Sequence, residues 1–140
     1  MVRRILLVED DPQDLELALR ALRNGGGSHR ILVARDGEEA LRILIAENPS
    51  SAADRPAVVV LDLKLPKLSG LEVLRRIRKT ATTRNVPVVM LTSSQEERDV
   101  AESYALGANA YVVKPLDSAK FVQCVRALGT FWGEYCVPPP

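Results

Sequence analysis

Polar side chains follow four separate apolar runs of the sequence, each at the point where the run ends. Three are carboxylates, one is a hydroxyl and one is an ammonium: Glu9 and Asp10 after residues 5–8, Asp62 after 58–61, Thr92 after 86–91 and Lys114 after 111–113. Carboxylates that lie close together repel one another unless a cation sits among them. Because oxygen ligands without His or Cys suit a hard cation, this set indicates a site for an ion such as Mg²⁺.

The same set of groups is suited to receiving a phosphoryl group. The carboxylate of Asp is a known covalent nucleophile in phosphoryl transfer. A metal ion and the Lys114 ammonium would neutralise charge on the transferred oxygens, and the Thr92 hydroxyl could bond one of them. The sequence therefore predicts phosphoryl-transfer chemistry wherever these side chains meet.

Ordinary structural roles are open to the same residues. Asp11 followed by Pro12 is typical of a helix N-cap, and we interpret Asp11 in that way. Taken singly, Asp62 fits a turn, Thr92 fits an N-cap and Lys114 fits a solvated helix start. These separate roles do not explain why such residues follow four apolar runs, so a shared site is favoured.

The apolar runs have the length and composition of buried strands. Short, β-branched-rich runs cover residues 5–8, 31–34, 58–61, 86–91 and 111–113. Apolar residues recur at helical spacing between them, within residues 15–22, 38–46, 71–77, 100–104 and 122–128. Five strands alternating with five helices predict an α/β fold with a parallel sheet and helices on both faces. Ligands bind at the carboxyl ends of such strands, where we expect the polar side chains to meet.

Size, charge and cysteine content exclude several classes of protein. The 140 residues suit one domain, without room for a DNA-binding output domain. Nineteen Lys and Arg against eighteen Asp and Glu give a net charge of +1, which predicts no nucleic-acid partner. Cys124 and Cys136 lack zinc-ligand spacing and are expected to be reduced thiols. No apolar run near the start is long enough for a signal peptide or a membrane span, so we expect a cytoplasmic protein without a membrane partner.

Two loops are predicted away from these strand ends. His29, the single histidine, follows the glycine run 25–27 and is interpreted as a surface loop residue. That glycine run follows a helix, whereas a dinucleotide-binding fingerprint follows a strand, so nucleotide binding is not predicted. Residues 47–56 are predicted to form a long surface loop.

Half of the aromatic residues crowd the end of the chain. Phe131, Trp132 and Tyr135 lie within the last ten residues, before three prolines. One interpretation is that they fold back and cover the domain's own core. The favoured interpretation is an aromatic arm that docks on another subunit or a partner, because aromatic residues are enriched at interface anchors.

Four segments resemble the receiver domain of two-component response regulators, across about residues 3–129. The segments are ILLVEDDP, VVVLDLKLPKLSG, VVMLTSS and ANAYVVKP, which contain all the polar side chains described above. The resemblance implies a flavodoxin-like receiver fold with the sheet order 2-1-3-4-5. It divides the chain into a receiver domain over residues 1–129 and an aromatic, proline-rich tail over residues 130–140.

The resemblance implies that Asp62 accepts a phosphoryl group from a phosphohistidine of a sensor histidine kinase, with Mg²⁺ as cofactor. Asp10 and Asp62 would be direct metal ligands, and Glu9 would act mainly through water. The backbone carbonyl of Lys64 would complete the ligand set.

The remaining matched residues have implied roles in the switch that follows phosphorylation. Lys114 would pair with a phosphoryl oxygen, and the Lys114–Pro115 peptide bond would be cis. Thr92 would close on the phosphoryl group, and Tyr111 would turn inward into the space that Thr92 leaves. The surface of the fourth helix, fifth strand and fifth helix would then change its preference for partners.

A narrower resemblance is to the single-domain regulators that accompany bacterial phytochrome kinases. It rests on the long loop before the third strand, the segment DLKLPKLSG and the FW pair near the end. In that subgroup the tail helps to build a homodimer, which implies an interface of the fourth helix, the fifth helix and Phe131, Trp132 and Tyr135. Lys64 departs from the Asn common in the subgroup, and we expect an altered acyl-phosphate lifetime.

The leading interpretation is a stand-alone phosphorylation switch whose output is protein binding, and not an enzyme beyond supporting its own phosphorylation and dephosphorylation. An alternative is a relay intermediate that passes the phosphoryl group to a histidine phosphotransfer protein. An Mg²⁺-dependent phosphohydrolase usually has an acid two residues after its nucleophile, where this chain has Lys64. A degenerate receiver that serves as a scaffold would lack one of the matched residues.

Overall fold

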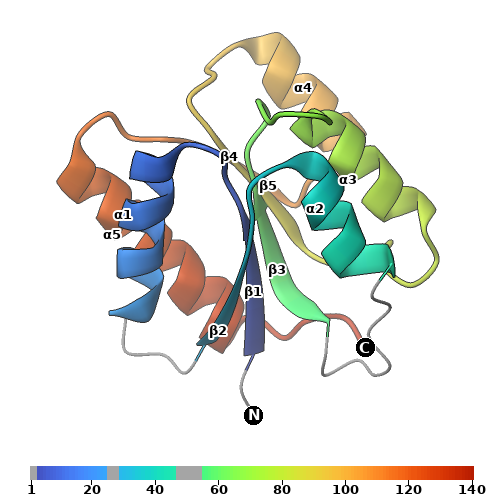
Figure 1. Cartoon of the computed structure of the whole chain (residues 1–140), viewed down its shortest axis with the longest axis horizontal. Coiled ribbons are helices and arrows are strands. Elements are labelled where there is room, and N and C mark those ends of the chain that lie inside the picture. The colour runs from blue at the N-terminus through green and yellow to red at the C-terminus, as the bar shows by residue number, and fades with distance from the viewer. Residues whose placement is uncertain (1–2, 25–28, 47–54) are drawn as a thin grey trace.

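The computed structural model of the chain describes residues 3–24, 29–46 and 55–140. Within them, five strands form a parallel sheet in the order β2-β1-β3-β4-β5 (Figure 1), which confirms the predicted fold and strand order. Ile5 of β1 lies between Ile31 of β2 and Val58 of β3, and Val89 of β4 pairs with Ala110 of β5. The strands are β1 (Arg3–Val8), β2 (His29–Ala34), β3 (Pro56–Leu61), β4 (Val88–Thr92) and β5 (Ala110–Val113).

Helices follow the strands in alternation, as the apolar spacing predicts. They are α1 (Pro12–Arg23), α2 (Gly37–Leu41), α3 (Gly70–Lys79), α4 (Glu97–Ala105) and α5 (Ser118–Thr130). Asp11 caps α1 by accepting a hydrogen bond from the Gln13 amide, with Pro12 at the first helical position, which confirms its predicted role. The predicted helix over residues 38–46 is α-helical only to Leu41 and continues as a π-helix, η1 (Arg42–Ala46).

Side chains of alternate residues in the central strands pack into two separate hydrophobic cores, one on each face of the sheet. Ile5 and Leu7 pack beneath α1 and α5, whereas Leu6 and Val8 pack beneath α2 and α3. Figure 1 shows α1 and α5 on one face and α2, α3 and α4 on the other. This arrangement places every carboxyl end of a strand at the same edge of the sheet.

The fourth helix packs less deeply than its spacing predicts. Val100 and Tyr104 were expected to share a buried apolar face, but Tyr104 is exposed and the one buried residue of α4 is Ser103. The Tyr104 hydroxyl instead accepts a hydrogen bond from the Tyr111 amide at 3.2 Å. The reason for the difference is that tyrosine has a polar hydroxyl, which here takes part in a hydrogen bond at the surface instead of entering the core.

The tail folds back over the amino ends of the strands, where Figure 1 also shows both termini. After α5 the chain continues as a π-helix, η3 (Phe131–Tyr135), which contacts β1 and β3. Trp132 packs against the core beneath α5, whereas Phe131 and Tyr135 are 51% and 75% exposed. Each interpretation of the aromatic tail thus fits some of its residues.

The tail also corrects the interpretation of His29 as a surface loop residue. His29 is the first residue of β2, and its side chain is only 5% exposed. Gly133 lies so close that a Cβ atom there would be 2.3 Å from His29 Cε1, and Glu134 Oε1 is 3.9 Å from His29 Nε2. Local sequence gives no sign of this burial because the covering residues lie more than one hundred positions away.

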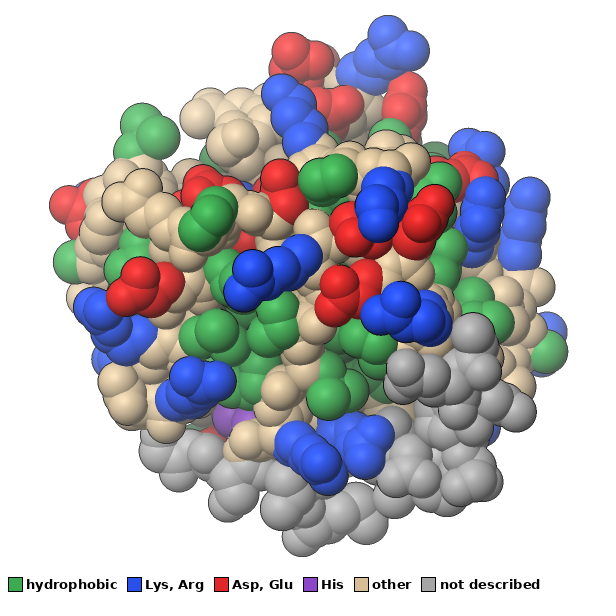
Figure 2. All heavy atoms as spheres, in the orientation of Figure 1, with side chains coloured by type: hydrophobic (Ala, Val, Ile, Leu, Met, Phe, Trp, Pro, Cys, Tyr) green, Lys and Arg blue, Asp and Glu red, His purple; other side chains and the backbone are tan. Residues whose placement is uncertain are grey.

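Residues 47–54 of the predicted loop 47–56 lie outside the described residues. The glycine run 25–27 lies outside them as well. On the face seen in Figure 2, acidic and basic side chains are interspersed, in keeping with the net charge of +1. In the part of the chain that the structure describes, no helix has the length and apolar character needed to cross a membrane.

Candidate functional site

The carboxyl ends of β1 and β3 bring three carboxylates together. Glu9, Asp10 and Asp62 each offer an oxygen, and these oxygens lie within 4.8 Å of one another. The sheet fixes two of them, because the Glu9 amide donates to Ala34 O at 3.0 Å and the Asp62 amide donates to Val8 O at 3.3 Å. Glu9 and Asp62 are buried and Asp10 is exposed, so the cluster has one open side.

Lys114 reaches into this cluster from the end of β5. Its Nζ lies 2.7 Å from Glu9 Oε1, 2.8 Å from Asp62 Oδ2 and 2.9 Å from Asp14 Oδ2. The Lys114 side chain is 10% exposed. Because an ammonium has three N–H donors, each donor is matched to a carboxylate. The structure thus brings together four of the predicted residues and adds Asp14.

Burial and charge shift the pKa values of this cluster in opposite senses. Burial raises the pKa of Glu9 from 4.5 to about 7, in spite of the adjacent Lys114 ammonium, which lowers it. Burial by itself would lower the pKa of Lys114, but its hydrogen bonds to Asp62, Glu9 and Asp14 raise it well above its ordinary value. The ammonium therefore stays charged, and Glu9 gains and loses its proton near neutral pH.

The loop after β3 holds Asp62 in place. The Lys64 amide donates to Asp62 Oδ1 at 3.4 Å, while the Lys64 side chain is exposed. The amide of Gly70, at the start of α3, donates to Leu63 O at 2.7 Å. A Cβ atom at position 70 would lie 2.0 Å from the backbone oxygen of Asp62, so only glycine allows this approach.

Thr92 and Tyr111 are linked through Ser94 rather than to each other. Thr92 is buried at the end of β4, and its hydroxyl oxygen accepts a hydrogen bond from the Ser94 amide at 3.4 Å. The Tyr111 hydroxyl donates to the Ser94 backbone oxygen at 3.0 Å. The Ser94 hydroxyl in turn contacts Asp99 in the first turn of α4. The loop after β4 therefore connects Thr92, at the end of β4, to α4 and β5.

Two features of the site differ from the sequence analysis. The described residues contain no cis peptide bond, so the predicted cis bond between Lys114 and Pro115 is wrong, and the bond has the trans form that X–Pro bonds generally favour. Asp14 was missed as a site residue. Its position in the first turn of a helix suggests only an ordinary acidic residue near a helix N-terminus.

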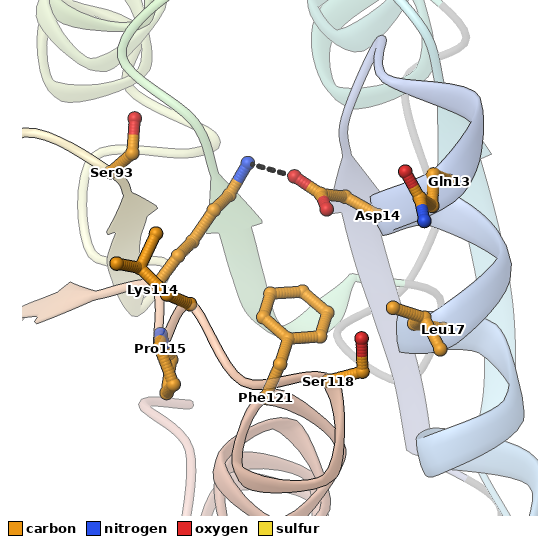
Figure 3. Close-up of a pocket in the computed structure, with 9 residues that line it drawn as sticks. Gln13, Asp14, Leu17, Ser93, Lys114, Pro115, Ser118 and Phe121 are labelled. Carbon is orange, nitrogen blue, oxygen red and sulfur yellow. Dashed lines mark hydrogen bonds and ion pairs between the residues drawn. The ribbon is translucent and has the colours of Figure 1, made fainter.

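A small cavity adjoins the acidic cluster between α1 and the start of α5. Its volume is about 190 Å³. Figure 3 shows Lys114 and Asp14 reaching toward one another above Phe121. The other lining residues are Gln13, Leu17, Ser93, Pro115, Leu116 and Ser118.

The acidic cluster, the buried ammonium and the hydroxyl at the next strand end agree with a comparison against protein families. The profile of the response regulator receiver domain matches residues 5–126. The chain belongs to this family. Among curated relatives, Response regulator Rcp1 of Synechocystis sp. is 36% identical over 135 residues, which cover 96% of this chain and 92% of Rcp1.

Solved structures place this receiver domain beside phytochrome response regulators. The phosphorylated cyanobacterial phytochrome response regulator RcpA has a TM-score of 0.91 and 36% identity, with each chain covered completely. The bacteriophytochrome response regulator RtBRR is 52% identical with a TM-score of 0.75, over all of this chain and 86% of that chain. The Mn²⁺-bound form of Rcp1 has a TM-score of 0.88 and 34% identity, over 99% of each chain.

The chemistry of the acidic cluster fits a divalent metal ion. Glu9, Asp10 and Asp62 offer only carboxylate oxygens, the ligand type that Mg²⁺ and Mn²⁺ prefer. The exposed side of the cluster at Asp10 leaves room for the water ligands that Mg²⁺ usually keeps. The residues present therefore suit such an ion without any other ligand type.

Proposed function

We propose that this receiver domain is a stand-alone response regulator that a sensor histidine kinase phosphorylates on Asp62. The observation that carries the proposal is the position of Asp62 Oδ2, 2.8 Å from Lys114 Nζ and within the cluster formed with Glu9 and Asp10. A carboxylate beside a buried cation can approach an anionic phosphoryl donor without uncompensated repulsion. Coverage of 92% of Rcp1 supports the stand-alone arrangement.

In the proposed reaction an Asp62 carboxylate oxygen attacks the phosphorus of a phosphohistidine on the kinase. A P–O bond forms and the P–N bond breaks, so that the imidazole leaves with the electron pair and takes up a proton. Lys114 then pairs with a phosphoryl oxygen, since its partner oxygen on Asp62 loses charge in the acyl phosphate. Hydrolysis later returns the carboxylate and releases inorganic phosphate.

The metal ion in this proposal is Mg²⁺, held by Asp10 and Asp62 directly, by Glu9 mainly through water and by the backbone carbonyl of Lys64. When bound, the ion supplies positive charge that neutralises the transferred phosphoryl oxygens. The oxygen-only cluster and the similarity to the Mn²⁺-bound form of Rcp1 support this assignment.

The proposed output is a change in the surface of α4, β5 and α5. Thr92 would donate a hydrogen bond to the phosphoryl group, and turning its side chain to do so would alter its present hydrogen bond from the Ser94 amide. A movement of the Ser94 loop would displace the hydrogen-bond acceptor of Tyr111, because the Tyr111 hydroxyl donates to the Ser94 backbone oxygen. Because α4 is shallowly packed, its position is the part of the fold that such a movement changes most readily.

A bacteriophytochrome-type kinase is the proposed source of the phosphoryl group. The similarity to RcpA and RtBRR supports this choice, as does 36% identity to Rcp1. We place the reaction in the cytoplasm, as the sequence analysis expects. A relay to a histidine phosphotransfer protein is the alternative, and mixing the phosphorylated protein with such a protein would reveal any loss of the adduct.

Homodimerisation through the tail is a further part of the proposal, with residues 130–140 acting as an interaction arm of the receiver domain 1–129. Exposed Phe131 and Tyr135 border a shallow apolar hollow on the outer side of α5, which a second copy of this chain would cover. Gln123, Arg126, Ala127 and Thr130 line the rest of it. Light scattering of a Phe131→Ala/Tyr135→Ala variant should give the monomer mass, and a dimer mass would contradict the proposal.

The first test of the phosphoacceptor is intact mass after incubation with Mg²⁺ and acetyl phosphate. One labile phosphoryl adduct is expected on the wild type and none on Asp62→Asn. The control variant is Asp117→Asn, because Asp117 caps α5 and lies outside the cluster. An adduct on Asp62→Asn, or none on a folded wild type, would overturn the proposal.

A further inference from the structure

Asp14 belongs to the site through its contact with Lys114, but it is not a member of the acidic cluster. It lies in the first turn of α1, and its Oδ2 is 2.9 Å from Lys114 Nζ. The group of oxygens that could hold a metal ion consists of Glu9, Asp10 and Asp62 only, within the described residues. Asp14 therefore contacts the ammonium without belonging to the set that would hold the ion, and it lines the adjoining cavity (Figure 3).

The position of Asp14 is fixed by the helix rather than by the acidic cluster. Asp11 caps α1 and Pro12 begins it, which sets the first turn that carries Asp14. The side chain is 28% exposed, so its carboxylate keeps contact with water. An acidic side chain is also favoured by the partial positive charge of a helix N-terminus. Asp14 can thus hold Lys114 whatever occupies Asp62.

We infer that Asp14 is a positioning residue that competes with the phosphoryl group for Lys114 and thereby lengthens the lifetime of the acyl phosphate. This inference rests on the proposed function of Asp62 as phosphoacceptor. In the unphosphorylated protein each Lys114 donor is matched to a carboxylate, one of them on Asp14. After phosphoryl transfer, the ammonium divides its charge between the phosphoryl oxygens and Asp14.

The direction of the effect follows from where negative charge develops during hydrolysis. Water attacks phosphorus, the bond from phosphorus to the Asp62 oxygen breaks, and its electron pair returns to the carboxylate. Lys114 Nζ lies 2.8 Å from Asp62 Oδ2 in the unphosphorylated protein, so the ammonium is beside the carboxylate that regains this charge. A fully available ammonium therefore stabilises the transition state more than the acyl phosphate and speeds hydrolysis. Asp14 opposes this stabilisation by drawing the ammonium away.

The test compares Asp14→Asn, which keeps the shape and removes the charge, with Asp14→Ala, which removes the contact. Each protein is phosphorylated with acetyl phosphate and Mg²⁺, the donor is removed, and adduct decay is followed by intact mass. Because a partly exposed ion pair contributes modestly, we expect roughly three- to tenfold shorter half-lives for both variants. Glu16→Gln is the matched control, since Glu16 lies on α1 but pairs with exposed Arg20.

A spectroscopic readout separates positioning from a simple effect on helix stability. The ¹⁵N-labelled ammonium of Lys114 is expected to exchange its protons with water faster in the unphosphorylated Asp14→Ala protein than in the wild type. A purely structural role of Asp14 would lower the unfolding temperature and leave both this signal and the adduct half-life unchanged.

The outcomes separate the inference from the proposed function. Shorter half-lives in both Asp14 variants, with Glu16→Gln equal to the wild type, support the inference. An adduct on the wild type whose half-life is unchanged or lengthened in the Asp14 variants overturns the inference alone. No adduct on the folded wild type overturns the proposed function, and the inference with it.

Discussion

The two ends of the sheet are held together by different forces. At the carboxyl ends of the strands, the ammonium of Lys114 pairs with carboxylates that follow β1 and β3 and with one in α1. At the amino ends, Trp132 packs on the core and Arg3 donates hydrogen bonds to the backbone oxygens of Trp132 and Cys136. The first region is organised by charge, and the second by apolar packing and backbone contacts.

This difference indicates which end of the sheet can respond to a bound ligand. Charge pairs exchange partners when a phosphoryl group or a metal ion arrives, because the new charge competes directly with the old one. A packed indole gains nothing from a new charge and resists displacement, since leaving the core costs its buried area. We therefore expect the effects of variants at the carboxyl end to depend on metal and pH, and the effects of variants at the tail to be independent of metal.

The largest expected effect is that of Lys114→Ala. Removal of the ammonium leaves Glu9 and Asp62 without their shared cation, which should lower the unfolding free energy by about 3 kcal/mol. Urea denaturation with and without Mg²⁺ measures this, and the ion should restore part of the loss. Lys120→Ala is the control, because Lys120 is exposed on α5. Equal losses with and without Mg²⁺ would contradict the idea that charge organises this end.

The tail is expected to show a smaller loss that is independent of metal. Trp132→Ala removes a partly buried indole from the core and should cost about 2 kcal/mol. Val137→Ala is the matched control, because Val137 is exposed and substitutions of exposed side chains usually change stability by less than about 0.5 kcal/mol. Thermal unfolding with and without Mg²⁺ provides the measurement. A metal-dependent loss in Trp132→Ala would remove the distinction between the two ends.

Stability should depend on pH through Glu9. Its pKa is raised to about 7 in the folded protein, so between about pH 4.5 and 7 the folded state binds more protons than the unfolded state. Without metal, the unfolding free energy should therefore fall as pH rises through this range, by about 1–2 kcal/mol from this group.

The difference between the wild type and Glu9→Gln isolates this dependence from other groups that titrate in the same range. Urea denaturation from pH 5 to pH 7.5 should give a shallower fall for Glu9→Gln. Because metal binding requires the carboxylate form, stabilisation by Mg²⁺ should increase over the same range in the wild type. Parallel pH profiles for the two proteins would argue against the raised pKa.

Lys64→Asn is expected to give the smallest effect. The exposed Lys64 ammonium can approach the phosphoryl oxygens from solvent, where an ion pair is weak. Its removal should lengthen the acyl-phosphate half-life by about twofold, opposite in direction to the Asp14 variants. Adduct decay followed by intact mass measures the change, and Lys67→Asn serves as the control. Equal half-lives for wild type and Lys64→Asn would show that the Lys64 side chain stays in solvent.

Local patterns of the sequence determined the elements and the edge at which the site forms. Alternation of short apolar runs with helical spacing predicted the parallel sheet, and Asp11–Pro12 predicted the start of α1. The convergence of Glu9, Asp62 and Lys114 followed from one rule, that parallel strands end at the same edge. These features need only neighbouring residues and chain direction, which the sequence contains.

The tertiary structure alone decided which side chains touch across the chain. The contact of Asp14 with Lys114 joins residues 100 positions apart, and the burial of His29 depends on Gly133 and Glu134. Periodicity identifies a buried face but not the partner that covers it, because packing depends on the distance and angle between whole elements. An ordinary acidic residue of a first helical turn therefore became part of the site, and a residue predicted in a loop became part of the sheet.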